Sequence, residues 1–108
     1  EIAAFAEALI LADRLGLGAE KAAEWLLSIP AASPYMKAKW EFMRKGGQPP
    51  NFSVALMAKD LRLMAEAAPG EMEVTRAAHE SFRDAASDGF ASEDIAHLIR
   101  RALGRVPD

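Results

Sequence analysis

Lys59 and Asp60 form a charged pair within a mostly apolar stretch that begins shortly after Phe52. Leu56 lies three residues before the lysine and Leu63 four residues after it, so helical spacing places the ammonium on a strip of leucines. An ammonium in an apolar setting costs free energy unless it has a partner. Two interpretations fit the spacing. The lysine packs its stem and keeps its charge in water, or it meets an anionic ligand or a partner domain.

Phe52 is open to two interpretations as well. It precedes Ser53, a residue typical of a helix N-cap, so it either packs as a hydrophobic staple at the helix entry or forms one wall of a pocket. His79 and His97 have no partner at the spacing of metal ligands, and no metal site is expected. The absence of cysteine excludes a thiolate zinc site and a cysteine nucleophile.

The region around Trp40 is basic, with Lys37, Lys39, Arg44 and Lys45. We interpret these residues as the solvated face of a helix with one core tryptophan, because the chain as a whole carries a net charge of -3. A nucleic-acid binder would need a basic surface. No apolar run approaches the roughly 20 residues of a membrane helix, and no secretory signal is recognisable. The sequence therefore predicts a soluble cytoplasmic protein without nucleic-acid or membrane partners.

The elements that must position these residues are helices. Of the 108 residues 51% are apolar, and 23 are alanine, whereas valine, isoleucine and threonine together number nine. Helix formers are therefore plentiful and strand formers scarce, which predicts an all-α protein. The length fits one domain, so we expect a single compact bundle of about six helices over residues 1–108.

Apolar spacing and start and stop residues predict the helices at residues 1–15, 19–29, 34–45, 54–68, 71–87 and from a cap at Ser92 to about residue 102. The expected inward positions are Ile2, Phe5, Leu9, Ala12, Ala22, Trp25, Leu26, Ile29, Met36, Trp40, Met43, Val54, Met57, Leu61, Met64, Ala68, Thr75, Ala78, Phe82, Ala85, Ile95, Leu98, Ile99 and Ala102.

Three further expectations concern particular helices. The fourth helix is apolar on two sides, which predicts a central place for it, with Arg62 and Glu66 in solvent. In the last helix Glu93 and Asp94 are expected in the first turn, where the helix dipole favours acids, and Gly104 and Pro107 are expected to close it. The first helix has no cap before it, so we expect it to be truncated, with the chain starting inside a helix of a longer protein.

Several segments together resemble one protein family. They are Ala6-Glu7-Ala8-Leu9, Arg14-Leu15-Gly16-Leu17, Ser33-Pro34-Tyr35-Met36-Lys37-Ala38-Lys39, Phe52-Ser53, Leu56-Met57-Ala58-Lys59-Asp60-Leu61-Arg62-Leu63, and Phe82 through Gly89 to Asp94-Ile95. Nearly the whole chain thus resembles the C-terminal domain of the β-hydroxyacid dehydrogenases. That family includes 3-hydroxyisobutyrate dehydrogenase and tartronate semialdehyde reductase and is related to 6-phosphogluconate dehydrogenase. The lysine-aspartate-leucine element is its most specific part, although Arg62 replaces a glycine and Met64 an alanine of the usual pattern.

The resemblance implies the C-terminal domain of a two-domain dehydrogenase, paired with its own N-terminal Rossmann domain, which binds NAD or NADP. This helical domain would close the cleft over a small hydroxy-acid substrate and form a homodimer. Lys59 would contact the cofactor near the nicotinamide, Asp60 would orient neighbouring polar groups and Phe52 would line the site. The glycine fingerprint, the substrate motif and the catalytic lysine of the family would lie upstream of Glu1. We therefore expect no catalytic residue in this chain and no activity from these 108 residues alone.

The reaction that the resemblance implies is reversible hydride transfer between a small 3-hydroxy acid and its semialdehyde. The alternative is a stand-alone helical dimerisation or adaptor domain without catalytic activity. In that case Trp25, Trp40 and the methionine-rich fourth helix would serve a protein interface. The Lys59-Asp60 pair after Phe52 separates the two hypotheses, because an adaptor has no reason to keep a charged pair there.

Overall fold

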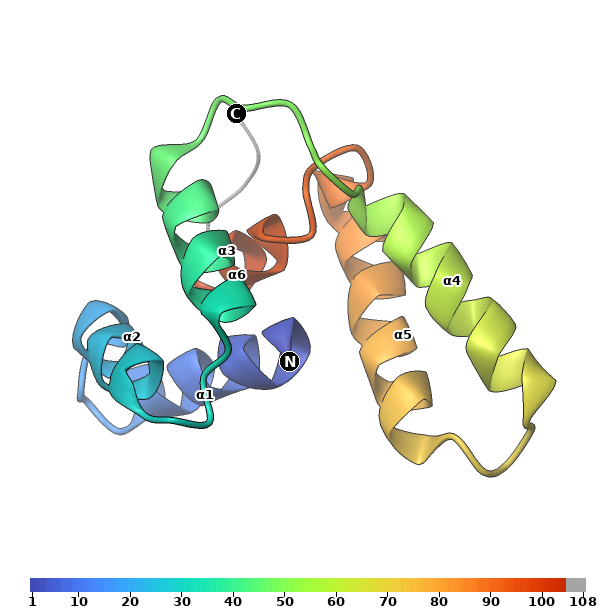
Figure 1. Ribbon diagram of the computed structural model, residues 1–108, viewed down its shortest axis with the longest axis horizontal. Coiled ribbons are helices and arrows are strands. Elements are labelled where there is room, and N and C mark those ends of the chain that lie inside the picture. The colour runs from blue at the N-terminus through green and yellow to red at the C-terminus, as the bar shows by residue number, and fades with distance from the viewer. Residues whose placement is uncertain (105–108) are drawn as a thin grey trace.

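A computed structural model of the protein describes residues 1–104, and within them the chain forms six α-helices, one π-helical turn and no strand (Figure 1). The elements are α1 (Ile2–Arg14), α2 (Ala19–Ser28), α3 (Pro34–Lys45), α4 (Val54–Ala67), α5 (Glu73–Ala85), η1 (Ala86–Phe90) and α6 (His97–Ala102). The all-α prediction is confirmed. No helix in residues 1–104 is long and apolar enough to cross a bilayer. Pro107, which was expected to close the last helix, lies outside the described residues.

The helix starts follow the chemistry of their caps. The Ser33 hydroxyl accepts the N–H of Met36 at 3.0 Å, and the Ser53 hydroxyl accepts the N–H of Leu56 at 3.2 Å. Each bond satisfies a backbone donor that the first turn of a helix leaves without a partner. The predicted cap at Ser53 is therefore confirmed, and it fixes where α4 begins.

The helices form two parts that Figure 1 separates clearly. We call α1, α2, α3 and α6 the four-helix body, and the antiparallel pair α4 and α5 the hairpin. Within the hairpin α4 and α5 pack against each other along their length. Two connections join the parts, one from α3 to α4 and one from η1 to α6.

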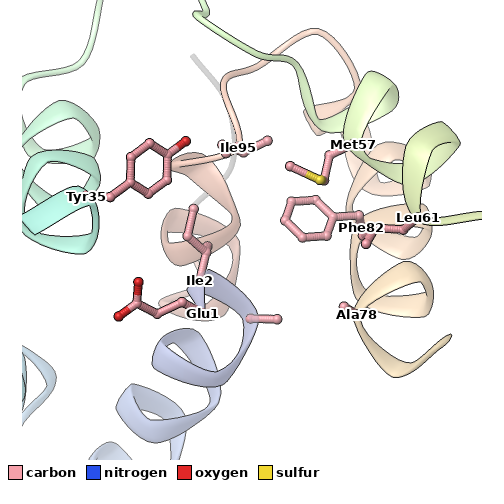
Figure 2. Close-up of a pocket in the computed structure, with 9 residues that line it drawn as sticks. Glu1, Ile2, Tyr35, Met57, Leu61, Ala78, Phe82 and Ile95 are labelled. Carbon is pink, nitrogen blue, oxygen red and sulfur yellow. The ribbon is translucent and has the colours of Figure 1, made fainter. Parts of the chain in front are cut away.

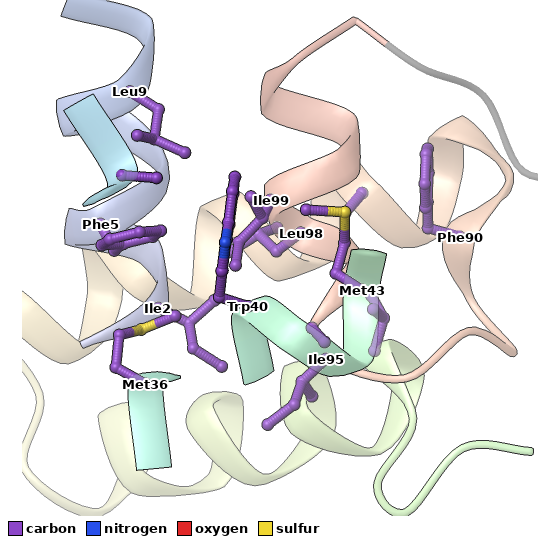
Figure 3. Close-up of a cluster of buried hydrophobic side chains, with 14 of the residues drawn as sticks. Ile2, Phe5, Leu9, Met36, Trp40, Met43, Phe90, Ile95, Leu98 and Ile99 are labelled. Carbon is purple, nitrogen blue, oxygen red and sulfur yellow. The ribbon is translucent and has the colours of Figure 1, made fainter. Parts of the chain in front are cut away.

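The core lies mainly in the four-helix body, where Trp40 of α3 stands between side chains of α1 and α6 (Figure 3). Its ring meets Phe5 edge-to-face, with the ring centroids 6.0 Å apart, which is a favourable arrangement of two aromatic quadrupoles. The predicted stripes of the first and third helices are confirmed as buried: Ile2, Phe5, Leu9, Ala12, Met36, Trp40 and Met43.

Trp25, Ile29 and Met64 were expected to face inward, and for all three the prediction is wrong. In α2 the side chains of Trp25 and Ile29 are 53% and 46% exposed, because this short helix packs through Ala22 and Ala23 instead. The fourth helix is not central. Val54 is its one fully buried residue, since α4 is the outer helix of the hairpin and leaves its far side uncovered.

The last helix begins five residues later than its predicted cap at Ser92. Asp94 forms an isolated antiparallel bridge with Ser53, and the N–H of Ile95 donates to the Phe52 carbonyl at 2.9 Å. Because the Ile95 N–H and the Glu93 carbonyl pair with the entry to α4, neither is available to a helix, and α6 starts only at His97. A long-range contact thus overrides a good local start signal.

Candidate functional site

Lys59 lies on the outer side of α4, where it is exposed together with Leu56 and Leu63. The two leucines are 49% and 47% exposed, so the strip predicted from spacing exists but faces outward. The ammonium therefore bears no burial penalty, and that part of the sequence argument is wrong. Arg62 is exposed as predicted and pairs with Glu66 at 3.0 Å.

Asp60 is exposed beside Lys59 on the second turn of α4. Among residues 1–104 no hydrogen bond or ion pair is made by the ammonium of Lys59 or the carboxylate of Asp60. Both charges remain available to groups outside the described chain.

Phe52 precedes the Ser53 cap and is half-buried against the core. Its carbonyl accepts the N–H of Ile95, and the N–H of Val54 donates to the Glu93 carbonyl, both at 2.9 Å. These bonds hold the backbone on both sides of Ser53. Phe52 and Lys59 thus share one rigidly held element, the entry and first two turns of α4.

A groove of about 340 Å³ separates the hairpin from the four-helix body (Figure 2). Met57 and Leu61 of α4 line one wall, and Ile2 and Tyr35 line the other. Glu1 lies at its rim. Hydrogen bonds from the side chain and the backbone N–H of Ser33 hold the pKa of the Glu1 carboxyl below its usual value. The carboxylate fastens the start of α1 to the start of α3.

The structure also contains a buried ion pair that the sequence analysis missed. The Lys39 ammonium donates to both carboxylate oxygens of Asp94, at 2.7 and 2.8 Å, and the two side chains are only 5% and 1% exposed. The ammonium lies 4.9 Å from the ring centroid of Phe42. We predicted a solvated lysine and an acid in the first turn of a helix, and both predictions are wrong. Lys39 follows Met36 by three residues and precedes Met43 by four, so the buried stripe of α3 carried the missing signal.

His97 is buried, with 3% of its surface exposed. Its ring meets Phe42 edge-to-face, and its Nε2 atom lies 3.8 Å from a carboxylate oxygen of Glu93. No group of three or more histidine or acidic side chains suited to a metal ion occurs in the described part of the chain.

Comparison with known proteins identifies the family. The sequence model of a family described as the NAD-binding domain of NADP-dependent 3-hydroxyisobutyrate dehydrogenase matches residues 1–102. The chain belongs to this family. The predicted membership of the β-hydroxyacid dehydrogenases is thereby confirmed, and so is the expected cofactor class, NAD or NADP.

Individual relatives of this 3-hydroxyisobutyrate dehydrogenase family carry two kinds of name. Glyoxylate/succinic semialdehyde reductase 1 of Arabidopsis thaliana is 33% identical over 99 residues, which are 89% of this chain and 34% of the relative. The cytokine-like nuclear factors N-PAC of Aedes aegypti and Anopheles gambiae are 34% and 33% identical over 104 residues, 94% of this chain. They are longer still, since the match covers 19% and 18% of them. The chain thus spans about a third or less of the length of these relatives.

The outer strip of α4 suits a dinucleotide chemically. NAD(P) carries anionic phosphates and flat, largely apolar rings. Lys59 offers an accessible cation with no counter-ion among residues 1–104, and Leu56 and Leu63 offer exposed apolar surface on either side. Charge-assisted contacts to phosphate and a few apolar contacts are what such a ligand needs.

Proposed function

We propose that this chain is the cofactor-facing helical domain of an NAD(P)-dependent oxidoreductase that interconverts a small 3-hydroxy acid and its semialdehyde. The observation that carries the proposal is the exposed Lys59, which has no counter-ion in the described residues and lies on the leucine strip of α4. The family is described by its NAD binding. The name of the Arabidopsis relative, a semialdehyde reductase, supports the substrate class.

In this proposal NAD(P) supplies the hydride chemistry, and the chain supplies position, charge and exclusion of water. The Lys59 ammonium binds the cofactor, Asp60 orients neighbouring polar groups, and Phe52 shapes the cleft. A Rossmann domain preceding this chain binds the rest of the dinucleotide, and the catalytic lysine lies upstream of Glu1. The 108 residues alone are therefore proposed to be inactive, because hydride transfer needs the cofactor and the catalytic lysine together.

The test is Lys59→Ala in the protein that joins this chain to its Rossmann domain. We expect the KM for NAD(P) to rise about 10- to 100-fold, because a charge-assisted hydrogen bond contributes about 1.5–3 kcal/mol and each 1.4 kcal/mol is about tenfold. Steady-state kinetics with the cofactor as the varied substrate measure the effect. Lys37→Ala is the matched control, since it removes the same charge from an exposed site on α3. An unchanged cofactor KM in the Lys59 variant contradicts the proposed role.

We also propose that the protein forms a homodimer through a surface on α1 and α2. Here an apolar groove of about 250 Å³ lies between the two helices, rimmed by exposed side chains that include Leu11, Leu15 and Trp25. In a two-fold symmetric dimer, the Trp25 ring of each copy can enter the groove of the other copy, so the same contact is made twice. Exposed apolar surface of this kind commonly marks an interface.

For this surface, Trp25→Glu is expected to shift the protein from dimer to monomer by at least a tenfold rise in the dissociation constant, since interface tryptophans often contribute 2 kcal/mol or more. Sedimentation equilibrium measures the constant. Val74→Glu is the control, because Val74 is 85% exposed on α5, in the other part of the molecule. A protein that is monomeric at high concentration before any substitution would refute the proposed surface.

A second candidate function is a dimerisation or adaptor domain without catalysis. It is supported by the names of the mosquito relatives, which are those of nuclear factors rather than enzymes. Exposed Leu56, Leu63 and Met64 on α4 would then face a protein partner. Calorimetric titration of the complete protein with NAD and NADP separates the candidates, because only the first requires nucleotide binding.

A further inference from the structure

Packing between the hairpin and the four-helix body is discontinuous: Val54 of α4 and Phe82 and Ala85 of α5 join the buried core, but grooves open elsewhere between the two parts. The groove of about 340 Å³ opens between the two parts, and a second groove of about 220 Å³ runs between α1 and α5. The parts are joined at one end, where the connections to α4 and α6 cross (Figure 1). The contacts that hold these two connections together therefore determine the direction in which α4 projects.

Three backbone hydrogen bonds hold the crossing together. The Ile95 N–H donates to the Phe52 carbonyl and the Val54 N–H to the Glu93 carbonyl, as described above, and the Ala55 N–H donates to the Ala91 carbonyl at 3.0 Å. They bind the entry of α4 to the segment 91–95. None of the three bonds involves α3.

The Lys39–Asp94 pair supplies the link to the body. Asp94 sits at the centre of the crossing, paired through its backbone with Ser53, while its carboxylate receives both hydrogen bonds from Lys39 on α3. Fifty-five residues separate the two side chains in sequence. A buried ion pair contributes little net stability compared with apolar side chains of the same size, but its geometry is specific.

We propose that Lys39 and Asp94 are positioning residues that fix the angle of the hairpin on the four-helix body and thereby place Phe52 and Lys59 for the cofactor. The part of this inference that concerns the cofactor rests on the proposed function. The part that concerns the angle stands on the structure alone. Neither residue touches the cofactor, so both act through the entry of α4.

The experiment replaces the pair by apolar side chains of similar volume, Lys39→Met with Asp94→Leu, and measures the hairpin angle directly. The chain has no cysteine, so spin labels at Glu41→Cys on α3 and Glu80→Cys on α5, both exposed, report one distance across the two parts. We expect a single narrow distance distribution with the pair intact. In the apolar variant we expect a shifted or at least twofold broader distribution, although the protein stays folded.

The matched control removes the exposed Arg62–Glu66 pair, which lies wholly within α4 with its atoms 3.0 Å apart, by Arg62→Met with Glu66→Leu. Its label distance is expected to stay unchanged. If the buried-pair variant fails to fold, Asp94→Asn takes its place, because it keeps the volume and one acceptor oxygen, and the same broadening is expected. A folded variant with the original distribution overturns the proposal, since a pair that only stabilised the core would leave the angle unchanged.

Kinetics of the same variant, joined to its Rossmann domain, test the link to the cofactor. We expect the KM for NAD(P) to rise on the order of tenfold or more, as small misplacements of a binding group do, with a smaller change in kcat. A changed label distance with an unchanged cofactor KM refutes the placement of the cofactor on α4 and leaves the angle-setting role intact. An unchanged distance refutes that role, whatever the cofactor KM.

Discussion

Asp94→Ala is expected to lower the free energy of unfolding by about 3–5 kcal/mol, because it leaves a buried ammonium without its counter-ion. The carboxylate accepts two hydrogen bonds from Lys39, at 2.7 and 2.8 Å. The rings of Phe42 and Tyr35 also lie near that ammonium, with their centroids at 4.9 and 5.5 Å. Ring faces attract a cation but do not replace a carboxylate. Urea denaturation followed by circular dichroism measures the loss.

The control for this prediction is Asp88→Ala. Asp88 pairs with Arg101 at 2.8 Å, a nearly identical separation, but these side chains are 57% and 32% exposed. Exposed ion pairs typically contribute about 0.2–1 kcal/mol, so this variant should lose no more than that. Equal losses from the two aspartates would show that burial does not govern the cost, and would contradict the reasoning for Asp94.

Local signals predicted most of the secondary structure. The caps at Ser33 and Ser53 depend on hydrogen bonds between residues three apart, so the sequence around each is sufficient to find them. The start of α6 depends instead on a bridge between Ser53 and Asp94, which are far apart in the chain. The sequence near Asp94 does not predict that bridge, and the acid after Ser92 resembles the first turn of a helix.

The difference between local and long-range contacts also explains which features of the candidate site could be predicted. Helical spacing correctly placed Lys59 with Leu56 and Leu63 on one strip, because that relation is local. Whether the strip is buried depends on what packs against α4, and in the described chain nothing covers that side. The family resemblance therefore remains the source of the cofactor role proposed for Lys59, and the structure contributes its accessibility.

The two tryptophans show what a hydrophobic pattern can predict and what it cannot. Trp25 and Trp40 both lie on apolar helical stripes, and the pattern predicted burial for both. Trp40 is 4% exposed, whereas Trp25 is 53% exposed. Periodicity identifies the apolar face of a helix, but it does not identify whether that face meets the core or a second molecule.

Trp40→Ala is expected to cost about 3–5 kcal/mol of unfolding free energy, the usual range for a large aromatic side chain removed from a core. Trp40 packs edge-to-face on Phe5 of α1, and the Arg44 guanidinium lies 5.7 Å from its ring. Its removal leaves a cavity where α1, α3 and α6 meet (Figure 3). Since a domain of this size has about 5–15 kcal/mol of stability in total, the variant should be close to unfolding at moderate temperature.

Trp25→Ala provides the comparison, because it makes the same substitution at the exposed tryptophan of α2. At protein concentrations low enough to keep the chain monomeric, its loss should stay within about 0.5 kcal/mol, as for surface substitutions generally. Thermal denaturation followed by circular dichroism measures both variants without relying on the removed fluorophore. A comparable loss from the two substitutions would mean that Trp25 is buried within the monomer, and the proposed dimer surface would then lose its central side chain.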